Sequence, residues 1–277
     1  TLYAVFLSTR TGSTVATTEK DIQTGLAPSL REELAFAERV AREAATIVNT
    51  FYIGSSEVRY KNDDEPVTEA DRSANQHIVT RIQARFPDDG ILSEESKDDL
   101  GRLQKERVWI VDPVDGTREY GEARTDWAVH VALAIDGKPV IGAVGLPGLG
   151  LVLRSDLPAP LRPAPARPRM VVSRTRSASE AVAVAEQIGA ELVPMGSAGA
   201  KAMAVVRGEA EIYLHTGGQY EWDSCAPAAV AAAHGLHISR VDGSPLVYNQ
   251  QDVYMPDLLI CRPEWASQVL QIVSALD

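Results

Sequence analysis

Two aspartates, Asp112 and Asp115, follow an apolar run and stand three residues apart. The run at residues 108–111 has the composition of a buried strand, where aspartate is disfavoured. Carboxylates held this close repel each other and lose hydration, which costs free energy unless a cation compensates. Oxygen ligands of this kind are the ones that Mg²⁺ and Mn²⁺ prefer. The alternative is an ordinary turn after the strand, because Pro113 and Gly116 favour turns.

Three more acidic residues stand where a strand ends or a helix begins. Asp71 lies in the opening turn of an expected helix, Glu94 follows a short apolar run, and Asp223 begins an alanine-rich helix. Helix capping or a solvated loop would explain each position alone. In α/β sheets, however, ligands collect beyond the carboxyl ends of strands and at helix N-termini. Together with Asp112 and Asp115, these three residues make five carboxylates, which would repel one another if they converged without a cation. The five acids therefore predict a metal site.

Composition restricts the kinds of partner. The chain of 277 residues is 45% hydrophobic and 23% charged, as in an ordinary globular protein, and its net charge is −11. That charge disfavours a nucleic-acid partner, and no apolar stretch reaches the length of a membrane span. The two cysteines, Cys225 and Cys261, form no C-x-x-C pattern, which argues against a disulfide framework and fits a reducing compartment. We therefore expect a cytoplasmic protein without nucleic-acid or membrane partners.

Periodicity predicts the elements that position the acids in the first half of the chain. Ser29 and Glu32 form a capping-box pattern that opens an amphipathic helix reaching about residue 51, and a second helix is expected over 69–85. Five strands are expected, at residues 91–93, 108–112, 127–135, 140–146 and 150–154. An Asp-Gly hairpin turn joins the strand at 127–135 to the strand at 140–146.

The second half follows a proline-rich segment at residues 156–168, which predicts a connector. Strands and helices then alternate, which predicts a parallel or mixed sheet with helical cover. The expected strands are 170–173, 192–194, 211–215, 236–239 and 258–261, and the expected helices are 178–188, 198–207 and two beginning near 223 and 263. Pro227 should fall in the first turn of its helix, where proline is tolerated.

These elements predict an α/β (α+β) protein of two halves. The expected division is an N-terminal tail at 1–28, an α+β domain at 29–155 with most of the metal ligands, the connector at 156–168 and an α/β domain at 169–277.

Four motifs, in this order, resemble the inositol monophosphatase superfamily of Mg²⁺-dependent, lithium-sensitive phosphatases. They are T-E-A-D at 68–71, E-E-S at 94–96, D-P-V-D-G-T at 112–117 and W-D at 222–223. The resemblance spans about residues 30–275 and implies a layered αβαβα sandwich.

Further motifs resemble the 3′(2′),5′-bisphosphate nucleotidases, the CysQ-like branch of that superfamily. They are Lys61 and Asp64 before P-V-T-E-A-D at 66–71, G-T-R-E-Y at 116–120, G-S-A-G-A-K at 196–201 and E-W-D-S-C-A-P at 221–227. Arg118 stands where that branch has lysine, and Ala200 where it has asparagine.

The resemblance implies hydrolysis of a phosphate monoester by metal-activated water, with two or three Mg²⁺ ions and Mn²⁺ as a substitute. Its expected substrate is 3′-phosphoadenosine 5′-phosphate, a small phosphorylated molecule. The implied metal ligands are Glu94, Asp112, the carbonyl of Val114, Asp115 and Asp223. The implied catalytic residues are Thr117, Asp71 and Glu94, and the implied substrate contacts are Gly116, Thr117, Arg118, Ser197 and Lys201.

Three alternatives remain beside this interpretation. Inositol monophosphatase and fructose-1,6-bisphosphatase activities occur in the same superfamily. A non-catalytic regulator with the same fold is the third, and it predicts the loss of at least one metal acid, whereas none is missing here. Both a monomer and a homodimer are compatible with the resemblance.

Overall fold

The computed structural model describes residues 30–52, 59–61, 65–67, 69–161, 163–175 and 177–276. The predicted tail at 1–28, Asp64 and Thr68 lie outside the described residues. Among the helices in these ranges, none has the length and hydropathy of a membrane span.

The first sheet has five strands in the order β3-β4-β5-β6-β7. Their bounds are Gly90–Ser93, Arg107–Asp115, Ala128–Ile135, Lys138–Leu146 and Leu151–Arg154. β3 is parallel to β4, and the other neighbours are antiparallel. The predicted hairpin turn is confirmed, because Asp136 and Gly137 have positive φ angles of 49° and 72°.

The second sheet has the order β12-β14-β10-β8-β9. The bounds are β8 Arg169–Ser173, β9 Glu191–Met195, β10 Ile212–His215, β12 His237–Ser239 and β14 Leu258–Cys261. β8 is parallel to β9 and β10, whereas β14 is antiparallel to both its neighbours, so the mixed sheet expected from the alternation is confirmed.

Two short ladders were not predicted. They are β1 Arg59–Lys61 with β2 Glu65–Val67, and β11 Gln219–Tyr220 with β13 Tyr254–Met255. Strands of two or three residues are too short to show a periodic pattern.

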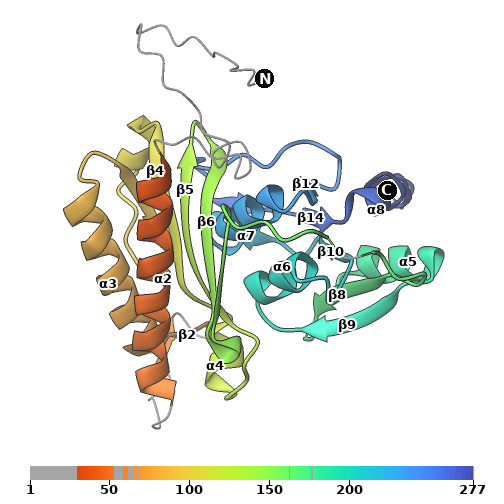
Figure 1. The fold of residues 1–277 in the computed structure, drawn as a ribbon, viewed down its shortest axis with the longest axis horizontal. Coiled ribbons are helices and arrows are strands. Elements are labelled where there is room, and N and C mark those ends of the chain that lie inside the picture. The colour runs from red at the N-terminus through yellow and green to blue at the C-terminus, as the bar shows by residue number, and fades with distance from the viewer. Residues whose placement is uncertain are drawn as a thin grey trace, which may run out of the picture.

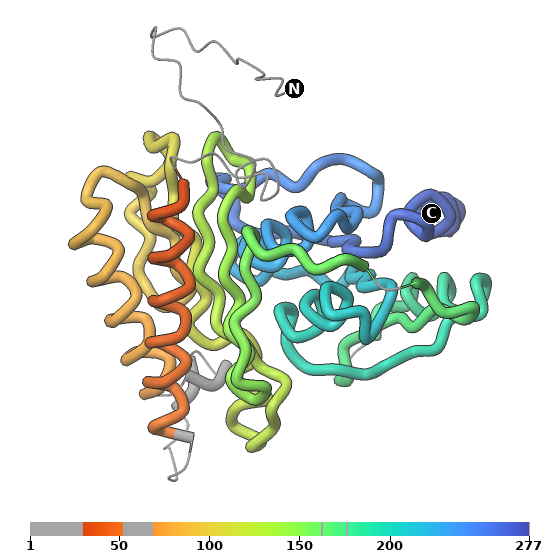
Figure 2. Tube along the Cα trace, in the orientation of Figure 1, coloured from red at the N-terminus to blue at the C-terminus, as the bar shows by residue number. Residues whose placement is uncertain are grey.

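The helices complete a five-layer sandwich, as predicted. They are α2 Arg31–Tyr52, α3 Glu69–Arg85, α4 Thr117–Gly121, α5 Ser179–Ile188, α6 Ala198–Val206, α7 Glu221–Ala233 and α8 Pro263–Val273. α2 and α3 cover the outer face of the first sheet, α6 and α7 lie between the sheets, and α5 and α8 cover the second (Figure 1). After β7 the trace leaves the first sheet and runs to the second (Figure 2).

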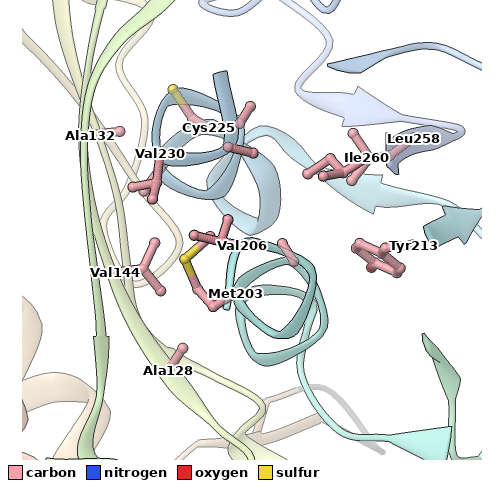
Figure 3. Packing of buried hydrophobic residues seen from close by; sticks show 14 of the residues in the cluster. Ala128, Ala132, Val144, Met203, Val206, Tyr213, Cys225, Val230, Leu258 and Ile260 are labelled. Carbon is pink, nitrogen blue, oxygen red and sulfur yellow. The ribbon is translucent and has the colours of Figure 1, made fainter. Parts of the chain in front are cut away.

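The middle layer joins the two halves through one continuous core. Met203 and Val206 of α6, with Val230 of α7, pack between the first sheet and the second (Figure 3). The fit is close because small residues line it: a Cβ on Gly142 of β6 would lie 2.4 Å from the carbonyl oxygen of Ala226. The two sheets are therefore packed on opposite sides of the same two helices, α6 and α7.

α7 begins earlier than expected. Its first residue is Glu221, and the carboxylate of Asp223 accepts a hydrogen bond from the N–H of Tyr220, Oδ2 to N 2.6 Å. Pro227 therefore lies beyond the first turn, so its predicted placement is wrong. Proline lacks an N–H, which leaves the Asp223 carbonyl without its usual helical donor.

Candidate active site

Three acidic side chains converge where the first sheet meets the middle layer. One carboxylate oxygen from each of Asp112, Asp115 and Asp223 lies within 4.8 Å of the others. The first two belong to β4 and the third to the opening turn of α7, and Asp112 and Asp115 are buried. Residues separated by more than a hundred positions are thus brought together, as the sequence predicted for a metal site.

A β-bulge turns the two aspartates of β4 toward one place. Asp112 pairs with His130 and Asp115 with Ala128, so the step from Asp112 to Asp115 is one residue longer than the opposing step on β5. In a regular strand residues three apart point to opposite faces, and the extra residue removes that opposition. The N–H of Val114 donates to Oδ1 of Asp112 at 3.0 Å, which stabilises the bulge. The strand therefore continues to Asp115, and its predicted end at Asp112 is wrong.

The electrostatics of the acids favour a bound cation. Burial raises the pKa of Asp112 well above its usual range, and the carboxylates of Glu94, Asp115 and Asp223 raise it further. Burial, followed by the charge of Asp115, raises the pKa of Asp223 to about 7. Acids that keep protons near neutral pH because of crowding would exchange them for a divalent cation, and carboxylate oxygens are the donors that Mg²⁺ takes. The donor set therefore fits the metal that the sequence implied.

Asp115 differs from its neighbours because three groups stabilise its charge. Its oxygens accept hydrogen bonds from the N–H groups of Ala198, at 3.1 Å, and Gly199, at 2.5 Å. The Nε2 atom of His130 makes an ion-pair contact with Oδ2 at 3.2 Å. Although burial raises the pKa of Asp115, His130 and the Gly199 N–H outweigh it, and the pKa is lowered. This acid therefore stays ionised in the cluster.

His130 connects two of the candidate ligands and was not singled out from the sequence. Its ring is fully buried, and its Nδ1 donates to the carbonyl of Trp222 at 2.9 Å, next to Asp223. Burial lowers the pKa of His130, but Asp115 and the Trp222 carbonyl outweigh burial and raise it. The sequence placed His130 only on the strand expected at residues 127–135, and its pairing with the strand of the aspartates is a finding of the structure.

The start of α6 is shaped around this histidine. A Cβ on Gly199 would lie 2.1 Å from Nε2 of His130, so only glycine leaves room for the ring. Ser197 has a φ of 35° and accepts the N–H of Ala200 at 2.9 Å as the N-cap of the helix. The buried ammonium of Lys201 donates to the carbonyls of Gly196, at 3.2 Å, and Ser197. In this structure the predicted substrate contacts Ser197 and Lys201 hold the loop that binds Asp115.

The predicted catalytic residues lie beside the three aspartates. Oγ1 of Thr117 is 3.3 Å from Oδ1 of buried Asp71 and 3.2 Å from the carbonyl oxygen of Val114. The carboxylate of Glu94 lies close enough to Asp112 to raise its pKa. The amide of Asn75 on α3 holds the turn after β3 by donating to the carbonyl of Glu95 at 3.3 Å. Sequence reasoning missed Asn75, which carries no motif of its own.

Gly116 permits the tight turn between β4 and α4. Its φ is 92°, and a Cβ there would lie 2.9 Å from Cβ of Ser197. Both the backbone conformation and the space therefore require glycine. The turn leaves Thr117 facing Asp71 and places the exposed Arg118 at the surface.

A cavity of about 290 Å³ adjoins this turn. It is lined by Arg118, Ser173, Thr175 and His215. The last three follow or end β8 and β10, at the carboxyl edge where ligands of α/β sheets collect, and they were not predicted. A larger cavity of about 630 Å³ lies along α2 and α3, and none of the predicted site residues lines it.

Comparisons with known proteins agree with this geometry. A 3′-phosphoadenosine 5′-phosphate phosphatase of Mycobacterium tuberculosis is 49% identical over 224 residues, which cover 76% of this chain and 84% of that protein. The 3′(2′),5′-bisphosphate nucleotidase CysQ of Escherichia coli is 30% identical over 231 residues, covering 78% of this chain and 94% of that protein.

The fold is shared with solved structures. CysQ from Bacteroides thetaiotaomicron has a TM-score of 0.74 at 26% identity and covers 84% of this chain and 97% of its own. An inositol monophosphatase of Thermotoga maritima has a TM-score of 0.75 at 19% identity, covering 88% and 98%. The family model described as the inositol monophosphatase family matches residues 29–276. By its sequence, fold and converging acids, the chain belongs to the inositol monophosphatase family.

Proposed function

We propose that the protein is a Mg²⁺-dependent phosphatase that removes the 3′-phosphate of 3′-phosphoadenosine 5′-phosphate, releasing adenosine 5′-phosphate and inorganic phosphate. One observation carries the reaction: Asp112, Asp115 and Asp223 converge beside the Thr117–Asp71 pair. The substrate is supported by the 49% identical relatives named for that activity.

The metal would be held by oxygen atoms of five residues: Glu94, Asp112, Val114 through its carbonyl, Asp115 and Asp223. When bound, the cations supply neutralisation of the phosphate charge and activation of a water molecule. Phosphoryl transfer depends mainly on such neutralisation and on in-line positioning.

Thr117 would orient the attacking water. Its hydroxyl hydrogen can be donated to Asp71 or to the Val114 carbonyl, which leaves Oγ1 able to accept a hydrogen bond from the water. Asp71 is buried, so it fixes the hydroxyl rather than serving as a solvated acid. The Gly116 turn would let the backbone approach the phosphate closely.

Arg118 supports a substrate with a second anionic group. Its exposed guanidinium follows Thr117 directly and lines the 290 Å³ cavity with two hydroxyl side chains, Ser173 and Thr175. A guanidinium and hydroxyls are the donors that bind phosphate. A bisphosphate could occupy the acid cluster and this cavity together.

We also propose that the protein acts in the cytoplasm, without nucleic-acid or membrane partners, and that residues 156–168 connect two domains. The buried free thiols of Cys225 and Cys261 support a reducing compartment. The absence of helix and strand among the described residues between β7 and β8 supports the connector.

The test is phosphate release from three substrates: 3′-phosphoadenosine 5′-phosphate, inositol 1-phosphate and fructose 1,6-bisphosphate. We expect the nucleotide to have the highest kcat/KM, EDTA to abolish release and Li⁺ to inhibit it. A much higher kcat/KM for inositol 1-phosphate than for the nucleotide would contradict the proposed substrate. Failure to release phosphate from any of them with saturating Mg²⁺ would favour the non-catalytic regulator.

A further inference from the structure

Two tyrosines leave unusually large aromatic surface in contact with solvent. Tyr220 is 43% exposed and Tyr254 is 49% exposed, and they are the only aromatic side chains classed as exposed among the residues whose burial the structure describes. They form a cross-strand pair between β11 and β13, with ring centroids 6.0 Å apart at 76°. The ring of Trp222 stacks on Tyr220 at 4.9 Å and 19°. We call Tyr220, Trp222 and Tyr254 the aromatic cluster.

The aromatic cluster adjoins the acid site. The main-chain N–H of Tyr220 donates to Asp223, and the carbonyl of Trp222 accepts from His130. The cluster therefore begins at the residues that flank one candidate metal ligand, on the side where α7 starts.

The aromatic cluster also reaches the 290 Å³ cavity. The Tyr254 hydroxyl lies over Gly218, where a Cβ would be 2.1 Å from it. The carbonyl of Gly218 is 2.9 Å from Nε2 of His215, and His215 lines the cavity together with Arg118. The aromatic cluster is thus linked to the acid site through Asp223 and to the cavity through Gly218 and His215.

Exposed, mutually supported rings in this place are suited to a flat π-system. Two of the rings are already stacked, so a third planar group adds to a preformed surface without ordering new side chains. Inositol and sugar phosphates have no flat aromatic face, whereas a nucleobase has one. Resting on the proposed function, we propose that the aromatic cluster binds the purine base of the substrate and sets the preference for nucleotides.

The test compares two substrates that differ only in the base. One is 3′-phosphoadenosine 5′-phosphate, and the other is its abasic analogue, 1-deoxyribose 3,5-bisphosphate. For the wild type we expect kcat/KM to be about tenfold higher or more with the base present. Tyr220→Ala and Tyr254→Ala should lower kcat/KM for the nucleotide about tenfold through KM and leave the abasic substrate within twofold. Tyr220→Phe, which keeps the ring, should behave as wild type.

Metal binding serves as the control. The N–H that reaches Asp223 belongs to the main chain and survives Tyr220→Ala, so the Kd for Mg²⁺ should not change. If the wild type hydrolyses the nucleotide and both alanine variants keep its KM for this substrate, the proposed base site is wrong. The proposed function would then remain intact. A change of molar mass by light scattering in these variants, with KM unaltered, would assign the cluster to contact between copies instead.

If the wild type fails to hydrolyse the nucleotide, the proposed function fails, and calorimetric binding of adenosine 5′-phosphate decides the inference by itself. Binding that is at least about tenfold weaker in Tyr220→Ala would support the base site, and equal binding, or none by the wild type, would refute it.

Discussion

Asp112 is a buried carboxylate whose neighbours oppose its charge. Burial and three surrounding acids raise its pKa, and its Oδ1 also accepts the N–H that stabilises the bulge. Asparagine keeps that acceptor and the side-chain shape but removes the charge. The effect of this residue on metal chemistry can therefore be separated from its effect on folding.

We expect Asp112→Asn to lower kcat by about 10³-fold or more at saturating Mg²⁺, because a charged ligand of the cation is lost. In EDTA the variant should be more stable to urea than wild type, since one repelling charge has been removed. Glu106→Gln, at an exposed residue just before β4, is the matched control and should change neither measurement. Near-normal turnover of Asp112→Asn would contradict the assignment of the site.

His130 acts through the ligands that it joins. It contacts Asp115 from β5 and holds the carbonyl next to Asp223, so it fixes the spacing between acids from two elements. Substituting a group that positions a metal ligand commonly weakens binding 10–100-fold.

We therefore expect His130→Ala to raise the Kd for Mn²⁺ about 10–100-fold, measured by calorimetry without substrate. His130→Asn keeps a side-chain donor for the Trp222 carbonyl and should lose less affinity. An unchanged Kd in both variants would show that the spacing of the acids does not depend on this ring.

At the scale of elements, the start of α6 and strand β5 fit each other at one point. Gly199 donates its N–H to Asp115 at 2.5 Å while leaving the space that the His130 ring fills. A methyl group at residue 199 must displace either the helix or the ring, because both are buried. α6 and β5, which are far apart in sequence, are therefore coupled through Gly199, because only a residue without a side chain fits there.

We expect Gly199→Ala to weaken metal binding and to lower stability by about 1–3 kcal/mol, as overpacking does. In the double variant His130→Ala/Gly199→Ala the added methyl group has room, so its cost should be smaller than in the wild-type background. Urea unfolding of the four proteins measures this coupling. Strictly additive losses would mean that the two residues do not compete for space.

The sequence predicted the elements whose signals are local. The amphipathic spacing in α2, the Asp-Gly turn after β5 and the order of strands and helices in the second half all depend on neighbours along the chain. The acids could be foreseen because charge at strand ends conflicts with burial. The bulge at Asp112, the early start of α7 and the role of His130 could not, because each depends on a partner from another element.

At the scale of the whole molecule, the acid cluster exists only when the layers are assembled. Asp112 and Asp115 belong to the first sheet, whereas Asp223 belongs to the middle layer that also packs against the second sheet (Figure 1). Unfolding separates these charges, so a cation that needs all three binds the folded state alone. Metal affinity and global stability must therefore be linked.

The linkage has a definite sign with pH. The folded pKa of Asp223 is raised from 3.8 to about 7, so the folded state binds this proton more tightly than the unfolded state does. Its stabilising contribution is complete below about pH 4 and is lost as pH rises through about 7, an effect of about 4 kcal/mol at most. The raised pKa values of Asp112 and His130 act in the same direction, whereas the lowered pKa of Asp115 acts only below its usual range.

In EDTA the free energy of unfolding should therefore fall between pH 5 and pH 8, and saturating Mg²⁺ should restore it, by more at pH 8 than at pH 5. The cation replaces the protons that the crowded acids lose, so its advantage grows as they ionise. Asp223→Asn is the diagnostic variant, because it removes the raised pKa while retaining an acceptor for the Tyr220 N–H. In EDTA the free energy of unfolding of this variant should fall less between pH 5 and pH 8 than that of the wild type. Saturating Mg²⁺ should also restore less of the variant's free energy of unfolding. Two results for the wild type would show that the acids are not crowded in the folded protein. One is a urea midpoint that does not change with pH in EDTA, and the other is an equal rise of that midpoint by Mg²⁺ at pH 5 and at pH 8.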